Sequence, residues 1–542
     1  MTDNNYTSKA SYIDAPILHS LLESDKEYAL IDVREAAAFS HGHLWLANPV
    51  PYARLELKIR RFVPRTDTHI VVCDDADGLA EQAASNLETM GYSNISILNK
   101  GVAGWKEAGY DLVDGNYVIA HSLGYFIEGH YATPVISASE LKTRLDKGES
   151  ILIVDARSEQ DYRSASIAGS ISVPAAEVAR RIPDLVKDAD TAVVFHCGGI
   201  TRAALGAQGI LNCGIENPVY SLIEGTRGWD MIDGELVGGQ PIDEAAPSKQ
   251  ATAFSAAAAA KLVSQYDLVY ISANELEDWQ EQNPKRTVYK IDVRSENEYL
   301  QRHFSGTLWI PGGELVGMTI DHLATQNARL CLYADHDCAR AEITANWMKL
   351  QGWQDVVIVS DWKQASDLLT GPEPDYYPEL YNPGVDLLAA RQCAEQLGSA
   401  DTLLLDFSSS AGYRKSHIPA AIWASRAQLY RQYKNLPDKT DIILSSEDGV
   451  TALLAARDLE KLSGRRAKVL QGGNSAWISA GFATETGVDE ILGEIDDIDK
   501  LALTGADRDS VMRGHQQGIR WRQGLYEQFK QDKPIIFRAD DK

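Results

Sequence analysis

Leu30-Ile-Asp-Val-Arg34 is the first of four related stretches in this 542-residue chain, and their aspartates lie 123, 137 and 114 residues apart. The other three are Ile153-Val-Asp-Ala-Arg157, Lys290-Ile-Asp-Val-Arg294 and Leu404-Leu-Asp-Phe-Ser408. A second apolar strand follows each aspartate and opens into a turn 40 to 42 residues later, at Cys73, Cys197, Ala334 and Ser446. Such regular spacing indicates a duplicated unit. The period is too long for a solenoid, so each repeat is expected to be a globular domain.

Within each repeat, short β-branched strands alternate with helical stretches. This alternation predicts an α/β fold in which a mainly parallel sheet carries helices on both faces. Ser137 and Ser272 each precede an Ala-x-Glu-Leu run. That pattern predicts a helix whose first N–H groups are capped by the serine side chain.

The repeats divide the chain into four tandem domains and a tail. We expect the domains over residues 10–130, 131–250, 260–372 and 380–488, and a helical C-terminal tail that docks on the rest over 489–542. The Ala-rich stretch 244–260 and the Pro-rich stretch 370–384 are interpreted as linkers. The aromatic-rich segment 115–134 is expected to pack against its neighbours.

Charge, hydrophobicity and cysteine content argue against several classes of protein. The net charge of −25 and the absence of a basic stripe argue against a nucleic-acid partner. The polar N-terminus and the short apolar runs predict neither a signal peptide nor a membrane span. Six cysteines without metal-type spacing predict free thiols in a cytoplasmic protein, with no metal and no cofactor.

Three motifs in register resemble the rhodanese family of sulfurtransferases. One is the D-x-R segment, with Asp155 and Arg157 in the second repeat; another is the strand ending in Cys197. The last is the Gly-x-x-x-Trp turn that ends at Trp229. The resemblance spans about residues 12–487 and implies the family's α/β domain and its persulfide chemistry. Four tandem copies are similar to bacterial multi-rhodanese thiosulfate sulfurtransferases.

The aspartate and arginine of the D-x-R motif are interpreted as structural, since a carboxylate and a guanidinium at a strand end pair with each other or with the loop backbone. Asp155, Arg157 and Trp229 are therefore predicted to support the fold. The fourth repeat has Ser408 where the arginine belongs, and Ser360-Asp-Trp362 of the third repeat lacks both glycines of the tryptophan turn. We expect the third and fourth domains to be scaffold.

Cys197 is the predicted persulfide nucleophile. The loop residues predicted to bind substrate are Gly198, Gly199, Ile200, Thr201 and Arg202. The two glycines let backbone N–H groups face inward as an anion nest, and the helix that follows favours a thiolate at its N-terminus. Thr201 is a candidate hydrogen-bond partner of sulfur, and Arg202 is a candidate for holding an anionic donor.

Cys73 is predicted to occupy the matching position in the first repeat, so it is a second candidate nucleophile. Its loop carries Asp74, Asp75 and Asp77, and carboxylates beside a thiol raise its pKa and repel anionic donors. The third and fourth repeats have Ala334 and Ser446 at this position and are expected to be inactive. Cys213, Cys331, Cys338 and Cys393 are interpreted as structural.

The predicted reaction moves sulfane sulfur from thiosulfate, or a related small donor, to a thiol or cyanide acceptor. Two alternatives stay open: 3-mercaptopyruvate as the donor, and a relay scaffold that passes sulfur to a protein acceptor. A phosphatase is disfavoured, because the Cys197 to Arg202 spacing is one residue short of the Cys-x5-Arg loop that wraps a phosphate.

Overall fold

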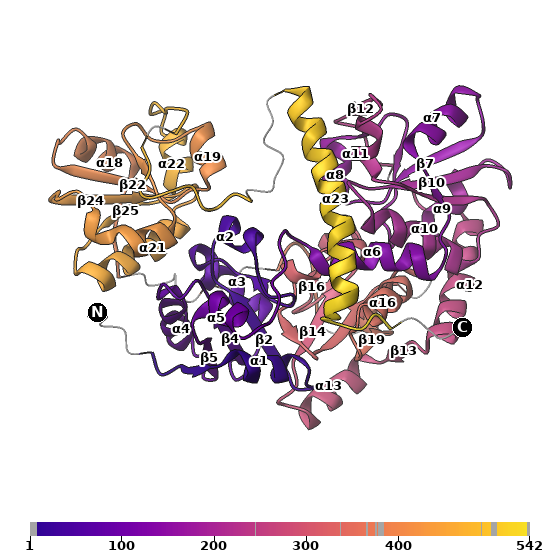
Figure 1. Cartoon of the computed structure of the whole chain (residues 1–542), viewed down its shortest axis with the longest axis horizontal. Helices are drawn as coiled ribbons and strands as arrows, with labels where there is room; N and C mark the ends of the chain where they lie inside the picture. Colours follow the sequence, from indigo (N-terminus) through magenta and orange to yellow (C-terminus); the bar gives the residue numbers. More distant parts are fainter. Residues whose placement is uncertain are drawn as a thin grey trace. The chain divides into compact units, whose positions relative to one another are not determined.

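The computed structural model describes residues 8–243, 245–335, 338–364, 367–373, 377, 384–488, 490–499 and 507–538. The chain forms two compact units. One contains Met1–Ser24, Tyr28–Asn116 and Asp375–Ala502; the other contains Asp25–Glu27, Tyr117–Pro374 and Leu503–Lys542. The first unit therefore joins the first and fourth repeats, and the second unit joins the second and third repeats with the C-terminal segment (Figure 1).

Four parallel sheets share one strand order, in which the last strand of the repeat lies beside the first. The strands that the first repeat contributes to its sheet, in spatial order, are β1 (Ser11–Ile13), β5 (Ile95–Leu98), β4 (His69–Cys73), β2 (Tyr28–Asp32) and β3 (Asn48–Pro49). Those of the second are β6 (Val135–Ile136), β11 (Val219–Leu222), β10 (Ala192–His196), β7 (Ile151–Asp155) and β9 (Ile171–Ser172). Those of the third are β13 (Val269–Ile271), β19 (Val356–Val359), β18 (Arg329–Tyr333), β14 (Val288–Asp292) and β16 (Leu308–Trp309). Those of the fourth are β21 (Asp386–Leu388), β25 (Lys468–Leu470), β24 (Asp441–Ser445), β22 (Thr402–Asp406) and β23 (Ile422–Trp423). The recurrence of one order confirms the predicted α/β class.

Helices connect these strands. The first repeat has α1 (Ala15–Leu22), α2 (Ala36–His41), α3 (Leu55–Phe62), α4 (Leu79–Thr89) and α5 (Gly101–Glu107). The second has α7 (Ala138–Asp146), α8 (Glu159–Ser164), α9 (Val178–Leu185), α10 (Thr201–Cys213) and α11 (Gly225–Asp230). The third has α13 (Ala273–Gln282), α14 (Glu296–Gln301), α15 (Gly312–Gly317) and α16 (Arg340–Leu350). The fourth has α18 (Ala390–Leu397), α19 (Ser410–Lys415), α20 (Arg426–Gln432), α21 (Val450–Ser463) and α22 (Gly473–Ser479).

Each sheet buries both of its faces, as the fourth repeat shows. Leu403 and Leu405 of β22 pack into a core with α20 and α21, whereas Leu404 between them belongs to a second core that includes Trp477 of α22. Alternate residues of a strand point to opposite faces, so a fully apolar strand feeds two cores at once.

Two segments between repeats depart from, or refine, the sequence interpretation. The predicted linker 244–260 falls largely within an 18-residue helix, α12 (Lys249–Tyr266), which Ser248 caps and which packs against α9, α10 and α16. Alanine has the highest helix propensity, so a run of alanines favours a helix over an open linker. The aromatic segment forms α6 (Val118–His130), which packs against α10 as expected. The predicted linker 370–384 lies mostly outside the described residues.

The predicted tail separates into two parts. Glu490 and Leu492 form backbone hydrogen bonds with Trp423, so this stretch extends the fourth sheet. The second part is the 25-residue helix α23 (Arg508–Asp532), which packs against α6 in the second unit (Figure 1). No helix of the described residues is long and apolar enough to cross a membrane.

Candidate active site

Cys197 follows the last residue of β10, at the carboxyl edge of the second sheet, where ligands of open α/β sheets bind. Its side chain is almost fully buried. The backbone N–H of Gly199 donates a hydrogen bond to Cys197 Sγ, with the two atoms 3.3 Å apart. The loop therefore turns at least one N–H group toward the sulfur, as a nest for an anion requires.

The tryptophan turn packs against the backbone of this loop and fixes its position. Gly225 has a φ of +51°, and a Cβ at this position would lie 2.0 Å from the carbonyl oxygen of Cys197. The N–H of Thr226 donates to that same oxygen at 2.8 Å. A glycine is required here because no side chain could occupy the space between the two backbones.

Strand register corrects the position of Cys73. In β-sheet pairing, Asp155 lies opposite His196, whereas Asp32 lies opposite Cys73. Cys73 therefore corresponds to His196, and the residue that corresponds to Cys197 is Asp74. The turn contacts agree, since the N–H of Val102 donates to the Asp74 carbonyl as Thr226 donates to that of Cys197. The prediction that Cys73 matches Cys197 is wrong by one residue.

Asp74 places a negative charge where Cys197 carries its sulfur. Its carboxylate accepts the N–H of Ala76 at 2.8 Å and that of Ala80 at 2.9 Å. Ala76 stands two residues after Asp74, as Gly199 stands two residues after Cys197. The loop and helix N-terminus of this fold thus form a cradle for an anion, and a carboxylate fills that cradle in the first repeat.

Cys73 points instead into the core of its domain and is fully buried. Its pKa is raised well above the usual range, first by burial and then by the charges of Asp32 and Asp74, while Arg34 opposes the shift. Asp75 and Asp77 form ion pairs with Arg34 and Arg431 instead. The predicted direction of the shift is confirmed, although burial and Asp32, rather than the loop carboxylates, are its main causes.

An acidic cavity of about 670 Å³ lies beside this loop in the first unit. Its lining includes Glu35, Asp75, Asp77 and Asp496 together with Arg431. Burial and the Asp496 charge raise the pKa of Glu35 to about 8. The surroundings of the first loop therefore disfavour an anionic ligand.

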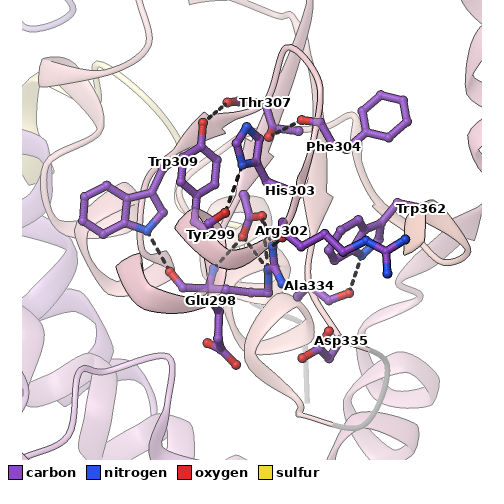
Figure 2. A network of polar contacts seen from close by, with 12 residues as sticks. Glu298, Tyr299, Arg302, His303, Phe304, Thr307, Trp309, Ala334, Asp335 and Trp362 are labelled. Atoms are coloured by element: carbon purple, nitrogen blue, oxygen red, sulfur yellow. Dashed lines mark hydrogen bonds and ion pairs between the residues drawn. The ribbon is translucent and has the colours of Figure 1, made fainter. Parts of the chain in front are cut away.

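The third and fourth repeats also lack a thiol at this position. Ala334 follows Tyr333, the residue paired with the motif aspartate Asp292. Figure 2 shows the indole N–H of Trp362 directed at the Ala334 carbonyl, where it donates at 2.9 Å. In the fourth repeat, Ser446 Oγ accepts the N–H of Ala452 at 3.3 Å. These two side chains have the expected place in the fold.

The motif aspartates and arginines form buried pairs. Nη2 of Arg157 donates to Asp155 at 2.7 Å and to the Ala165 carbonyl at 2.6 Å. In the fourth repeat the amide of Asn474 donates to Asp406 at 2.7 Å in place of the missing arginine. Trp229 is buried in the core of the second repeat. These contacts agree with the structural roles predicted for Asp155, Arg157 and Trp229.

Two of the loop residues predicted to bind substrate have other partners. Nη1 of Arg202 forms ion pairs with Asp161 at 2.9 Å and Glu314 at 2.8 Å. Thr201 Oγ1 donates to the carbonyl of Ala120 in α6 rather than to sulfur. Gly198 and Gly199 belong to the loop itself, and Ile200 is buried where α10 begins. The positive charge of Arg202 is thus compensated within the protein.

Sequence reasoning missed two arginines that lie beside the loop. A Cβ built on Gly199 would lie 3.7 Å from Nη1 of Arg227 and 3.9 Å from Nε of Arg522. Arg227 is one of the three unspecified positions of the Gly-x-x-x-Trp motif, so the motif does not single it out. Arg522 lies in α23, more than 300 residues along the chain, so no local pattern connects it with Cys197.

The other cysteines are buried and unpaired. Burial raises the pKa of Cys213 and Cys331 to about 12 and that of Cys393 to about 11, and it also raises the pKa of Cys338. The structural role predicted for these four thiols fits this burial. No group of three or more metal-ligating side chains is present among the described residues.

Comparison with curated proteins identifies partial relatives. YrkF, a candidate sulfur carrier protein of Bacillus subtilis (strain 168), is 28% identical over 102 residues, which are 19% of this chain and 54% of that protein. The HTH-type transcriptional regulator Rv0324 of Mycobacterium tuberculosis is 32% identical over 114 residues, 21% of this chain and 46% of that protein. The chain thus matches about half the length of each.

A solved structure matches the whole chain. The thiosulfate sulfurtransferase from Pseudomonas aeruginosa is 34% identical, with a TM-score of 0.92 over 98% of this chain and 100% of that chain. The family model described as Rhodanese-like domain matches residues 14–108, 137–231 and 389–480, about half of the sequence. The repeated sheet and these matches lead to one conclusion: the chain belongs to the rhodanese-like domain family.

Proposed function

We propose that this protein is a sulfurtransferase in which Cys197 carries sulfur as a persulfide. The thiolate attacks the outer sulfur of thiosulfate; the S–S bond of the donor breaks, and sulfite leaves with its electron pair. A thiol or cyanide acceptor then attacks the outer sulfur of the persulfide, and the Cys197 thiolate leaves. Each step transfers one sulfur atom without net oxidation by a further reagent.

The observation that carries this proposal is the anion cradle. Gly199 directs its N–H at Cys197 Sγ, and the same position in the first repeat holds the Asp74 carboxylate on two N–H groups. A position that accommodates a carboxylate also favours a thiolate or a persulfide anion. The match over the full length of the P. aeruginosa thiosulfate sulfurtransferase supports the choice of donor.

The boundaries of the four domains and the site assignments are part of this proposal. The nucleophile position holds Asp74, Cys197, Ala334 and Ser446 in the four repeats, so only the second has a thiol there. We propose a small-molecule donor and a thiol or cyanide acceptor, in the cytoplasm and without a cofactor. 3-Mercaptopyruvate as donor and a protein acceptor served by a relay scaffold are the alternatives.

Intact-mass measurement after incubation with thiosulfate tests the nucleophile. We expect a gain of about 32 Da, one sulfur atom, that peptide mapping places on Cys197. Cys197→Ser should abolish the gain and the thiosulfate:cyanide activity. Cys213→Ser, a buried thiol in the same repeat, is the matched control and should keep both. Sulfur found on Cys73, or activity retained in Cys197→Ser, would reject the assignment.

A further inference from the structure

The C-terminal helix α23 is attached to the second repeat by contacts along much of its length. Arg508 pairs with Asp230 at 2.6 Å, and His515 Nε2 lies 2.9 Å from the same carboxylate. Farther along, Tyr526 stacks on Tyr125 of α6 with ring centroids 5.5 Å apart. Figure 1 shows α23 crossing α6, against which it packs. The helix is therefore anchored on the elements that surround the Cys197 loop.

Arg522 is the residue that α23 contributes to this loop. Its side chain is 1% exposed and forms an ion pair with Glu224, which directly precedes Gly225 of the tryptophan turn. Its Nε is buried and has no hydrogen-bond partner among the described residues. The same Nε is the atom nearest the Gly199 position, 3.9 Å from a Cβ built there. An unused N–H donor thus lies against the loop of the proposed nucleophile.

Arg227, in α11, also lies beside the loop. Its Nη1 lies 3.7 Å from the same built Cβ. No hydrogen bond or ion pair joins its side chain to a described residue, although it is only partly exposed. Burial, and then the neighbouring Arg522, lower the pKa of Arg227, whereas Cys197 and Glu224 oppose this shift. The carboxylate of Glu224 pairs with Arg522, so Arg227 is left without an ion-pair partner among the described residues.

Other charged groups around the loop are balanced or neutral. Arg202 is paired with Asp161 and Glu314, and Arg157 with Asp155. Burial and the nearby arginines lower the pKa of His121 in α6 to about 3, so this ring is neutral at pH 7. Arg227 and Arg522 together carry two positive charges against the single negative charge of Glu224, so a net positive charge remains near Cys197.

We propose that Arg227 and Arg522 form an anion subsite for the sulfonate end of a thiosulfate-type donor, so that the C-terminal helix completes the active site of the second repeat. This inference rests on the proposed function and specifies its donor class. Guanidinium groups match the oxygens of a sulfonate and bind such groups through paired charge-assisted hydrogen bonds. A side chain at position 199 would be in van der Waals contact with both guanidiniums, and the glycine keeps such a side chain away from them.

Binding of inorganic sulfite tests the subsite without any sulfur transfer. Titration calorimetry on full-length Cys197→Ser protein should detect sulfite, and adding Arg227→Gln or Arg522→Gln should weaken its affinity roughly 10- to 100-fold, as expected for losing a hydrogen bond to a charged group. Arg520→Gln, an exposed arginine of the same helix, should change nothing. Arg227→Gln breaks no ion pair, so it remains informative if Arg522→Gln loosens the helix.

Kinetics of the otherwise unaltered protein separate the two proposals. In Arg227→Gln the KM for thiosulfate should rise roughly 10-fold or more, while transfer from an alkyl hydropersulfide, which has no sulfonate, stays within about 2-fold. Absence of persulfide on Cys197 would reject the proposed function, while the sulfite titration would still decide the subsite. Equal sulfite affinity with and without Arg227, or no binding in either protein, would overturn the subsite.

Discussion

Asp74 and Cys197 show how one position of this fold serves two purposes. Both side chains lie just beyond the end of the strand next to the motif strand, and both accept the N–H two residues later. A carboxylate is charged near neutral pH without help, although burial raises the pKa of Asp74 to about 6. At the same place a thiol becomes a better nucleophile, because the N–H groups of the cradle favour its thiolate form. A carboxylate there occupies the cradle without acting as a nucleophile.

Alkylation rates test the contrast between the two cysteines. Cys197 should react with iodoacetamide at pH 7 roughly 10-fold or more faster than Cys73, since each unit of pKa elevation lowers the thiolate fraction about tenfold. Peptide-resolved mass spectrometry over a pH series gives both rates, and the uncharged reagent avoids steering by local charge.

A loop variant checks the cause of the Cys73 shift. Asp75→Gly should hardly change the Cys73 rate, because Asp75 pairs with Arg34 and burial dominates the shift. A large acceleration in that variant, or a Cys73 rate equal to that of Cys197, would contradict the buried position assigned to Cys73.

At the scale of elements, much of the fold is readable from sequence. The Ser137 and Ser272 caps are confirmed, since each side chain accepts the N–H of the glutamate three residues later. Strand ends, the tryptophan turn and the place of Cys197 follow from local patterns. The Cys73 assignment fails because an offset of one residue in a strand reverses the direction of the side chain, and spacing alone does not resolve one residue. Arg522 is missed because its approach depends on tertiary packing.

The tryptophan turn gives a prediction at this scale. Gly225→Ala should destabilise the second repeat by about 1–3 kcal/mol or displace the loop, since the new Cβ meets the Cys197 carbonyl at a positive φ. Persulfide loading should fall with it. Gly129→Ala in α6 is the control, because a Cβ there meets nothing within 4 Å. Thermal unfolding and sulfur loading measure both effects, and normal loading in Gly225→Ala would show that the turn does not hold the loop.

Within each unit, ion pairs at buried positions join the two repeats. Arg202 of the second repeat reaches Glu314 of the third, and Arg340 of the third reaches Glu177 of the second at 3.4 Å. In the other unit Arg426 of the fourth repeat binds Glu56 of the first at 2.6 Å and Asp458 at 2.7 Å. Repeats without a thiol at the nucleophile position thus act as packing partners.

Removing the Arg426 guanidinium should be costly. Arg426→Ala leaves Glu56 and Asp458 buried without their counter-charge, and breaking a buried pair in this way costs about 3–5 kcal/mol. Arg466→Ala, whose partner Glu460 is solvent-exposed, should cost no more than about 1 kcal/mol. Chemical denaturation of the full chain compares them, and similar midpoints would argue against a central role for Arg426.

The reciprocal contacts of Arg202 and Arg340 have the form of a two-fold dimer, in which each partner offers the same patch to the other. Each arginine pairs with one acid of its own repeat, six residues after the motif aspartate: Asp161 for Arg202 and Glu298 for Arg340. Each also pairs with one acid of the neighbouring repeat, 22 residues after the motif aspartate of that repeat: Glu314 for Arg202 and Glu177 for Arg340. Because both partners belong to one chain, their association is unimolecular and mass action does not oppose it. Dilution therefore cannot separate the pair.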